Sequence, residues 1–182
     1  MTMKIGKKFW VTLFAFCLIA IAGLSIGIIL TKKDDDAIGE IDVSDLSEDV
    51  VSCLVEAEDS DCGELKNKLE NIIDSPKGEY GYDFVLASVY LSDILAKEDD
   101  YGAAINVLNE ALTKELSDEN RYYVLGALFN IYSDIDDKEN EIKTLRELID
   151  LPDSMELEQE SWPYVKQVFI ERLNEIEDNY EN

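Results

Sequence analysis

Apolar residues follow two different patterns along the chain. Residues 9–30 form one unbroken apolar run of 22 residues, FWVTLFAFCLIAIAGLSIGIIL, without a charge or a proline, and a helix of this length can cross a bilayer. From residue 45 onward, apolar residues instead recur at helical spacing, and no stretch alternates as a strand would. The two patterns together predict an all-α chain, with an N-terminal transmembrane helix followed by a domain of amphipathic helices.

Turn and capping residues divide that domain into helices. Pro76 and Pro152 each end an apolar stripe, Ser117 suits an N-cap, and Pro163 suits a first helical turn, where a missing N–H does no harm. The stretch 84–95 is apolar nearly all round, which predicts a central, buried helix. We therefore expect helices at 45–57, from Asp61 to Pro76, at 81–97, at 100–115, from Ser117 through Tyr132, at 138–150 and at 162–177, with a short helical turn at 154–160.

The second, fourth and sixth of these helices share one apolar pattern. Their matching positions are Leu65, Leu69, Ile72 and Ile73, then Ala104, Leu108, Ala111 and Leu112, then Glu141, Leu145, Leu148 and Ile149. The sets are offset by 39 and 37 residues, a period typical of repeats with two helices each. We expect a domain over 45–178 in which three helical hairpins stack as a solenoid and the last helix caps the stack.

Two motifs resemble a known repeat family. Tyr101-x-x-Ala104-x-x-x-Leu108-x-x-Ala111-Leu112 resembles the second helix of a tetratricopeptide repeat, and Tyr122-x-x-Leu125-Gly126-x-x-Phe129 resembles the first helix of the next repeat. Leu86-Ala87-x-x-Tyr90 is a partial match. Asp83 and Glu141 depart from the family, which has an aromatic residue and an alanine there, and the turn inside each unit is longer. The resemblance covers 82–152 and implies a solenoid that holds another protein on its concave face.

The layout of one span followed by degenerate repeats is also similar to the ancillary translocon-subunit family. That similarity implies a role in handling newly exported proteins or in envelope assembly.

Residues 9–31 have two interpretations. An uncleaved signal anchor is favoured because the apolar run continues eight residues past Ala22, but Ala20-Ile21-Ala22 before Gly23 also suits signal-peptide cleavage, which would release a secreted domain. Three lysines precede the run and two follow it, and this bias places the domain outside the cytoplasm of a bacterial-type cell. A cytoplasm-facing domain is the alternative orientation.

Small residues line one side of the expected span. Ala20, Gly23 and Gly27 recur at helical spacing, and such a face lets a second helix approach closely. This face raises the alternative that the chain is a structural subunit of a membrane complex assembled through its transmembrane helix, or a homo-oligomer. Simple packing against lipid is the other interpretation of the same residues.

Charge divides the chain as sharply as hydrophobicity does. Residues 1–8 form a basic flank, 32–44 an acidic linker and 179–182 an acidic tail, and all 41 acidic residues lie after residue 33 together with only 11 of the 16 basic ones. The part beyond the run thus carries a formal charge of −30, which excludes binding to nucleic acid through phosphate contacts. The same charge serves solubility or attracts basic segments of a protein partner.

Residue types that carry catalysis are scarce. The chain has no histidine and three scattered cysteines, so we expect no metal site, no cofactor and no enzyme activity. Asp99 and Asp100, like Asp136 and Asp137, fall at expected turns, where capping explains them better than acid–base chemistry. Outside the cytoplasm, Cys53 and Cys62 suit a disulfide across the first hairpin, while burial as two small apolar side chains is the alternative.

Tyrosines supply the remaining candidate site. Most are expected to pack between helices with their hydroxyls reaching water, but a set of aromatic residues on the expected first helices of the hairpins also suits a groove that grips an extended peptide. These candidate groove residues are Tyr82, Tyr90, Tyr122, Tyr123 and Phe129. The function that we predict from the sequence is therefore a membrane-anchored protein-interaction scaffold.

Overall fold

The structure, a computed structural model, describes residues 46–55, 62–74, 80–155 and 161–180. Within these residues the chain forms helices and no strand, as the apolar spacing predicts. The helices are α2 (Ser47–Val55), α3 (Gly63–Asp74), α4 (Tyr82–Lys97), α5 (Tyr101–Leu112), α6 (Asp118–Asp134), α7 (Lys138–Ile149) and α8 (Trp162–Tyr180). The chain divides into two compact units, 1–48 and 49–182, and the described helices fall almost entirely in the second.

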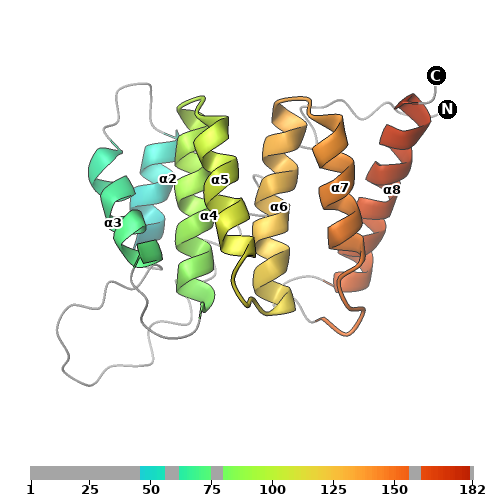
Figure 1. The fold of residues 1–182 in the computed structure, drawn as a ribbon, viewed down its shortest axis with the longest axis horizontal. Helices are drawn as coiled ribbons and strands as arrows, with labels where there is room; N and C mark the ends of the chain where they lie inside the picture. Colours follow the sequence, from blue (N-terminus) through green and yellow to red (C-terminus); the bar gives the residue numbers. More distant parts are fainter. Residues whose placement is uncertain (1–45, 56–61, 75–79, 156–160, 181–182) are drawn as a thin grey trace. The chain divides into compact units, whose positions relative to one another are not determined.

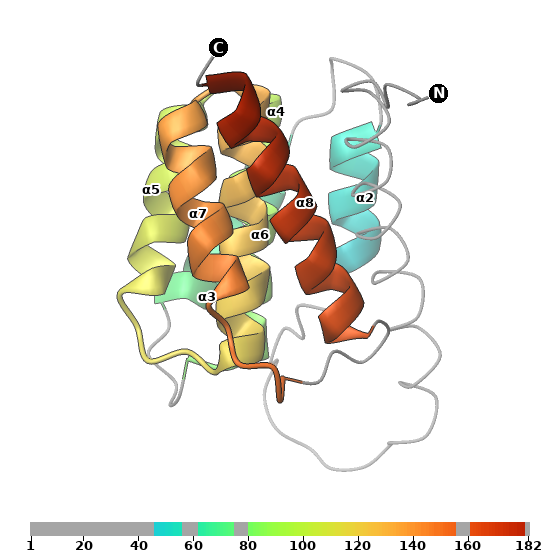
Figure 2. The same ribbon diagram turned by 90° about the vertical axis from the view of Figure 1, so that its right-hand side faces the viewer.

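The helices of the second unit pack mainly on their neighbours in sequence. Helix α3 packs on α4, α4 packs on both α5 and α6, and α6 packs on α5 and α7, while α8 packs on α7 (Figure 1). Viewed from the side, α5 and α7 lie in one layer and α4 and α6 in the next (Figure 2). Helix α4 is therefore packed against three other helices, as its nearly continuous apolar sequence predicts.

Two hairpins, α4 with α5 and α6 with α7, are built alike. Helices α5 and α7 each have 12 residues and begin 37 residues apart, at Tyr101 and Lys138. Helices α4 and α6 end at the same offset, at Lys97 and Asp134. The 37-residue period read from the apolar pattern is thus also the spacing of these elements.

In both hairpins the first helix ends in the same backbone conformation. Asp99 has a φ of 62° and Asp136 a φ of 61°, the left-handed conformation that commonly follows the last helical residues. The residue after each one donates its backbone N–H to the carbonyl five residues earlier, at an N–O distance of 2.9 Å in both hairpins. Each helix end therefore has its free carbonyls partly satisfied within the turn.

The next aspartate in each turn begins the second helix. Asp100 accepts a hydrogen bond from the backbone N–H of Ala103 at 3.1 Å, and Asp137 accepts one from Asn140 at 3.2 Å. Ser117 caps α6 in the same way, through the N–H of Asn120 at 3.2 Å. These paired turn carboxylates are helix caps, which is the structural role expected from the sequence.

The central core is shared by α4, α5 and α6. The side chains of this core are small or aliphatic where the helices approach closely. Ala104 and Ala111 on α5 pack there with larger side chains from α4 and α6. Its buried members are Val85, Val89, Ala104, Leu108, Ala111, Val124, Ala127, Leu128, Ile131 and Tyr132. Because each helix contributes to this core, a hairpin cannot bury its apolar face alone and depends on the next one.

The largest differences from the expected boundaries, three residues each, are at the ends of α5 and α8. Helix α5 stops at Leu112 instead of 115, and α8 continues to Tyr180 instead of 177. After α5, the N–H groups of Thr113 and Lys114 bond carbonyls three residues earlier, which tightens the chain into the turn before Ser117. The expected helical turn at 154–160 falls mostly outside the described residues.

Candidate functional site

A surface pocket lies at the junction of α3, α4 and α5. Its volume is about 420 Å³, within the range of sites that hold small molecules or partner side chains. The end of α3 supplies Glu70, Ile73 and Asp74, α4 supplies Phe84 and Leu91, and α5 with the turn after it supplies Val107, Glu110, Ala111 and Lys114; Tyr80 completes the lining. The pocket exists because α3 and α5 both pack on α4 and leave a space between them.

The floor and the rim of this pocket differ in chemistry. Leu91 and Ala111 are buried beneath it, while Glu70, Asp74 and Glu110 are exposed around it. The ends of two helices thus bring three carboxylates over an apolar surface. Such an arrangement favours a ligand that has both an aliphatic part and a positive charge.

Lys114 is the one basic side chain of the pocket lining, and it is already engaged. Its Nζ lies 3.9 Å from a carboxylate oxygen of Glu110 and 5.3 Å from the ring centroid of Tyr80. The Tyr80 ring in turn packs edge-on against Phe84, with centroids 4.9 Å apart. These contacts fix one wall of the pocket, and they hold the ammonium group between an aromatic ring and a carboxylate.

The sequence-predicted groove residues do not share one open surface. Tyr82 on α4 and Tyr123 on α6 have ring centroids 6.2 Å apart, and Tyr82 is 44% exposed. Tyr122 and Phe129 instead pack against α8, and Phe129 is only 6% exposed. The ring contacts of Tyr122 and Phe129 with α8 are those of an inter-helix core.

Helix α8 meets these aromatic rings through its own. The Trp162 ring lies 5.6 Å from that of Tyr122, and the Phe169 ring lies 6.0 Å from that of Phe129. Both α8 residues are 1% exposed. Burial of aromatic residues of this size makes α8 an integral part of the packed helices.

Tyr90 lies on a polar face of α4 that also carries Asp93. Positions 82, 86, 90, 93 and 97 fall on one side of this helix. Burial raises the pKa of the Asp93 carboxyl to about 7. Burial, followed by the proximity of Tyr82 and Asp93, raises the pKa of Tyr90 to about 12. A carboxyl group whose charged form is disfavoured is a candidate proton-binding group.

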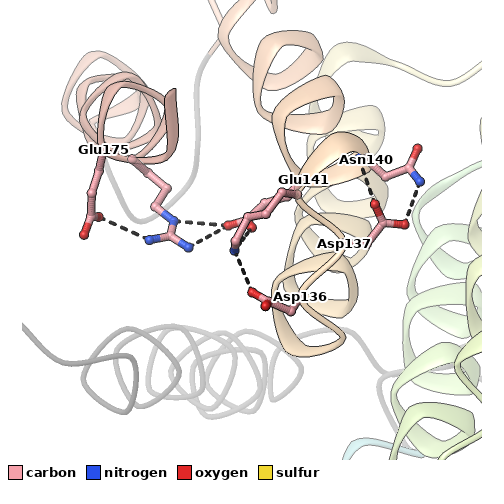
Figure 3. Close-up of polar contacts among 7 residues, drawn as sticks. Asp136, Asp137, Asn140, Glu141 and Glu175 are labelled. Atoms are coloured by element: carbon pink, nitrogen blue, oxygen red, sulfur yellow. Dashed lines mark hydrogen bonds and ion pairs between the residues drawn. The ribbon is translucent and has the colours of Figure 1, made fainter. Parts of the chain in front are cut away.

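A second group of charges surrounds one buried carboxylate between α7 and α8 (Figure 3). Glu141 is fully buried, and its Oε1 accepts hydrogen bonds from Arg172 Nη2 at 2.8 Å and Nε at 3.1 Å. Its Oε2 lies 2.6 Å from Nζ of Lys138, which also contacts Asp136 at 3.2 Å. Both carboxylate oxygens are therefore used, which makes this cluster a clamp between helices and leaves little capacity for chemistry.

Asp134, at the end of α6, is exposed but partly shielded from water by its neighbours. The carboxyl group of Asp134, the last residue of that helix, has its pKa raised by burial. Carboxylates also sit unfavourably at the negative end of a helix.

Among the described residues, no group of three or more His, Cys, Asp or Glu side chains is placed to hold a metal ion.

Cys53 and Cys62 are joined by a disulfide between α2 and the start of α3, with Cα atoms 5.8 Å apart. Both residues are nearly fully buried. The Nζ of Lys97, at the end of α4, donates a hydrogen bond to the backbone carbonyl of Cys53. The disulfide and this bond tie the first hairpin to the helix that follows it.

The expected membrane anchor lies outside the described residues. This holds for the basic flank, the span 9–31, its small residues Ala20, Gly23 and Gly27, and the linker 32–44. None of the helices in the described part combines the length and the hydrophobicity that a bilayer crossing requires.

Sequence reasoning missed the pocket. Glu70 and Asp74 are spaced as neighbours on one helix surface, and so are Glu110 and Lys114. Each pair alone is typical of an ordinary solvent-exposed helix face. Only the packing of α3 beside α5 on α4 brings them together.

Comparisons of the chain with protein-family models, with curated proteins and with solved structures found no match.

Proposed function

We propose that this chain is a membrane-anchored scaffold that binds another protein through its helical domain. The observation that carries the proposal is the pair of like hairpins, whose second helices have the same length and whose turns share one conformation at a 37-residue offset. Stacked hairpins of this kind present extended surfaces built from many helices, and repeat proteins use such surfaces to bind partners. The tetratricopeptide-like motifs at 101–112 and 122–129 support the same function.

The apolar run 9–30 supports the membrane anchor, and the lysine bias around it supports an extracytoplasmic domain. The Cys53–Cys62 bond is consistent with that side, because disulfides persist mainly in oxidising compartments. The domain would then be tethered at the outer face of the membrane by the linker 32–44, in reach of exported proteins.

Crosslinking from defined positions tests the binding function. A photoreactive residue is placed in the full chain, in its own cells, at Tyr82, at Val107 or at Asp150, which is an exposed control at the end of α7. The proposal expects a discrete adduct with another protein from Tyr82 or Val107, and none from Asp150. If no position gives an adduct, or if all three give the same diffuse products, the scaffold function is wrong.

The same crosslinks distinguish assembly through the span. Replacing Gly23 and Gly27 by Leu blocks close approach of a second helix there. The scaffold proposal expects the adducts from the helical domain to persist in this variant, whereas a subunit held in its complex by the transmembrane helix would lose them.

Thiol labelling tests the side of the membrane. In a chain with Cys17→Ser, only Cys53 and Cys62 remain, so a membrane-impermeant thiol reagent reports on these two alone. Labelling of intact cells only after reduction is the expected result. Labelling that requires lysis would place the domain in the cytoplasm.

A further inference from the structure

We infer that the pocket between α3, α4 and α5 receives an arginine or lysine of an extended partner segment, together with an aliphatic neighbour of that residue. The inference rests on the proposed binding function and names the surface and the chemistry of its partner. Three features carry it: the charge of the rim, the apolar floor, and the size and position of the pocket.

The rim carries an excess of negative charge. Glu70, Asp74 and Glu110 face a single ammonium group, that of Lys114, which lies between Glu110 and the Tyr80 ring. Within the described part of the chain, neither Glu70 nor Asp74 forms an ion pair, although Lys66 and Lys68 on the same helix pair with Glu98 and Glu64. Neither carboxylate is neutralised by a cation within that part of the chain, and the excess of negative charge on the rim favours cations and repels anionic ligands.

The floor selects among cations. Ile73, Phe84, Leu91, Val107 and Ala111 present apolar surface below the carboxylates. A small hydrated cation would leave that surface in contact with water, because it brings no apolar atoms. The side chains of Arg and Lys have aliphatic stems that cover apolar surface while their charged heads reach a polar rim, so they fit both levels of the pocket.

The size and position of the pocket favour a polypeptide. A volume of about 420 Å³ falls in the range that accommodates drug-sized ligands. Its rim is formed by exposed residues at the ends of α3 and α5, so a backbone can lie across the opening and lower a basic side chain and its aliphatic neighbour into it. Arginine is the better match of the two, since its planar group can bond two carboxylate oxygens at once.

A pair of peptides tests this assignment on the full chain in detergent micelles. The probe is acetyl-Gly-Leu-Arg-Leu-Gly-amide, and its control replaces Arg by citrulline, which keeps the shape and removes the charge. Methyl resonances of Ile73, Val107 and Ala111 report on the floor, and those of Val85 in the buried core report on the fold. The Arg peptide is expected to shift the first three and not Val85, and citrulline is expected to weaken binding by about tenfold or more, as for the loss of a charge-assisted hydrogen bond.

Matched variants locate the charge. Glu70→Gln with Asp74→Asn keeps the shape of the rim and removes two charges, and it is expected to weaken binding of the Arg peptide by about tenfold. Glu139→Gln with Asp150→Asn removes two charges from α7, away from the pocket, and is expected to leave the affinity within about twofold, because distant exposed charges are screened.

Each contrary result has a defined meaning. Equal binding of the Arg and citrulline peptides, or an equal loss in the two double variants, would overturn the assignment of a basic partner residue. Methyl shifts confined to other helices would overturn the pocket as the site. In the crosslinking experiment, adducts from Tyr82 without any from Val107 would reject the pocket and keep the scaffold function, whereas no adducts at all would reject the function itself.

Discussion

Asp99 and Asp136 occupy the same position in two successive hairpins, each in the left-handed conformation that ends a first helix. Their φ angles are 62° and 61°, and they lie 37 residues apart. An aspartate tolerates this conformation better than most residues do, but glycine adopts it without a steric penalty. The repeat therefore contains the same mild backbone strain twice.

Replacing Asp99 by glycine is expected to stabilise the domain. The free energy of unfolding should rise by roughly 0.5–1 kcal/mol, because the left-handed penalty disappears. Asp136→Gly should gain less, since Asp136 also contacts Lys138 at 3.2 Å. Chemical denaturation measures both. Asp150→Gly is the control, because Asp150 has an ordinary φ of −77° and should gain nothing. A destabilising Asp99→Gly would contradict the strain argument.

Glu141→Ala is expected to cost roughly 1–3 kcal/mol of unfolding free energy, because it removes a buried carboxylate that both cations share, while Lys138 keeps Asp136 and Arg172 keeps Glu175. The Glu141→Ala/Arg172→Met double variant should lose clearly less than the sum of its single changes. Glu177→Ala removes an exposed contact with Arg146 between the same two helices and should cost less than about 1 kcal/mol. Additive losses at Glu141 and Arg172 would show that the clamp contributes no coupling.

Asp93→Asn is expected to change how stability depends on pH. The carboxyl has a folded-state pKa of about 7 against an ordinary value of 3.8, so the folded protein binds the extra proton between these values. The contribution of Asp93 therefore favours folding at low pH and is lost as pH rises from about 4 through 7. An asparagine at this position does not titrate, so the variant should gain stability over the wild type by roughly 1–3 kcal/mol at pH 8. Urea titrations at several pH values measure the difference, and parallel curves would exclude it.

Reduction of the Cys53–Cys62 disulfide is expected to lower stability by roughly 2–3 kcal/mol, the chain-entropy value for a loop of this length. The loss should be concentrated in the first hairpin. Hydrogen exchange of α2 and the start of α3 should accelerate on reduction, while exchange in α6 and α7 stays slow. The Cys53→Ser/Cys62→Ser variant serves as the control, since a reductant should not affect it. Uniform acceleration across all helices would show that the disulfide acts on the whole domain.

The helices are predictable because their signals are local. Ser117 caps α6 as its position before an apolar stripe indicates, and the stop before Pro152 follows from the ring that a helix cannot accommodate. The turn aspartates are recognisable as caps for the same reason. These features depend on neighbours within a few residues along the chain, which a sequence displays directly.

The contacts between helices are less predictable. In the sequence, Glu141 stands out only as an exception to a small-residue position, because its partner Arg172 is 31 residues away on α8. The sequence leaves Phe129 with two interpretations, packing between helices or lining a groove, and it does not identify Phe169 on α8 as the ring that packs against it. The pocket likewise depends on two helices that are not adjacent in sequence. Apolar spacing defines which face of a helix is buried, and it does not define what is buried against it.

The clamp at Glu141 also has a consequence for how α8 is aligned along α7. Apolar stripes tolerate sliding of one helix past another by a turn, because similar side chains recur along each stripe. A slide of one turn would separate Arg172 from Glu141 and remove two hydrogen bonds from a buried carboxylate that would keep only Lys138, at a cost of roughly 1–3 kcal/mol. The ion pair between Arg172 and Glu141 thus favours one axial position of α8 along α7.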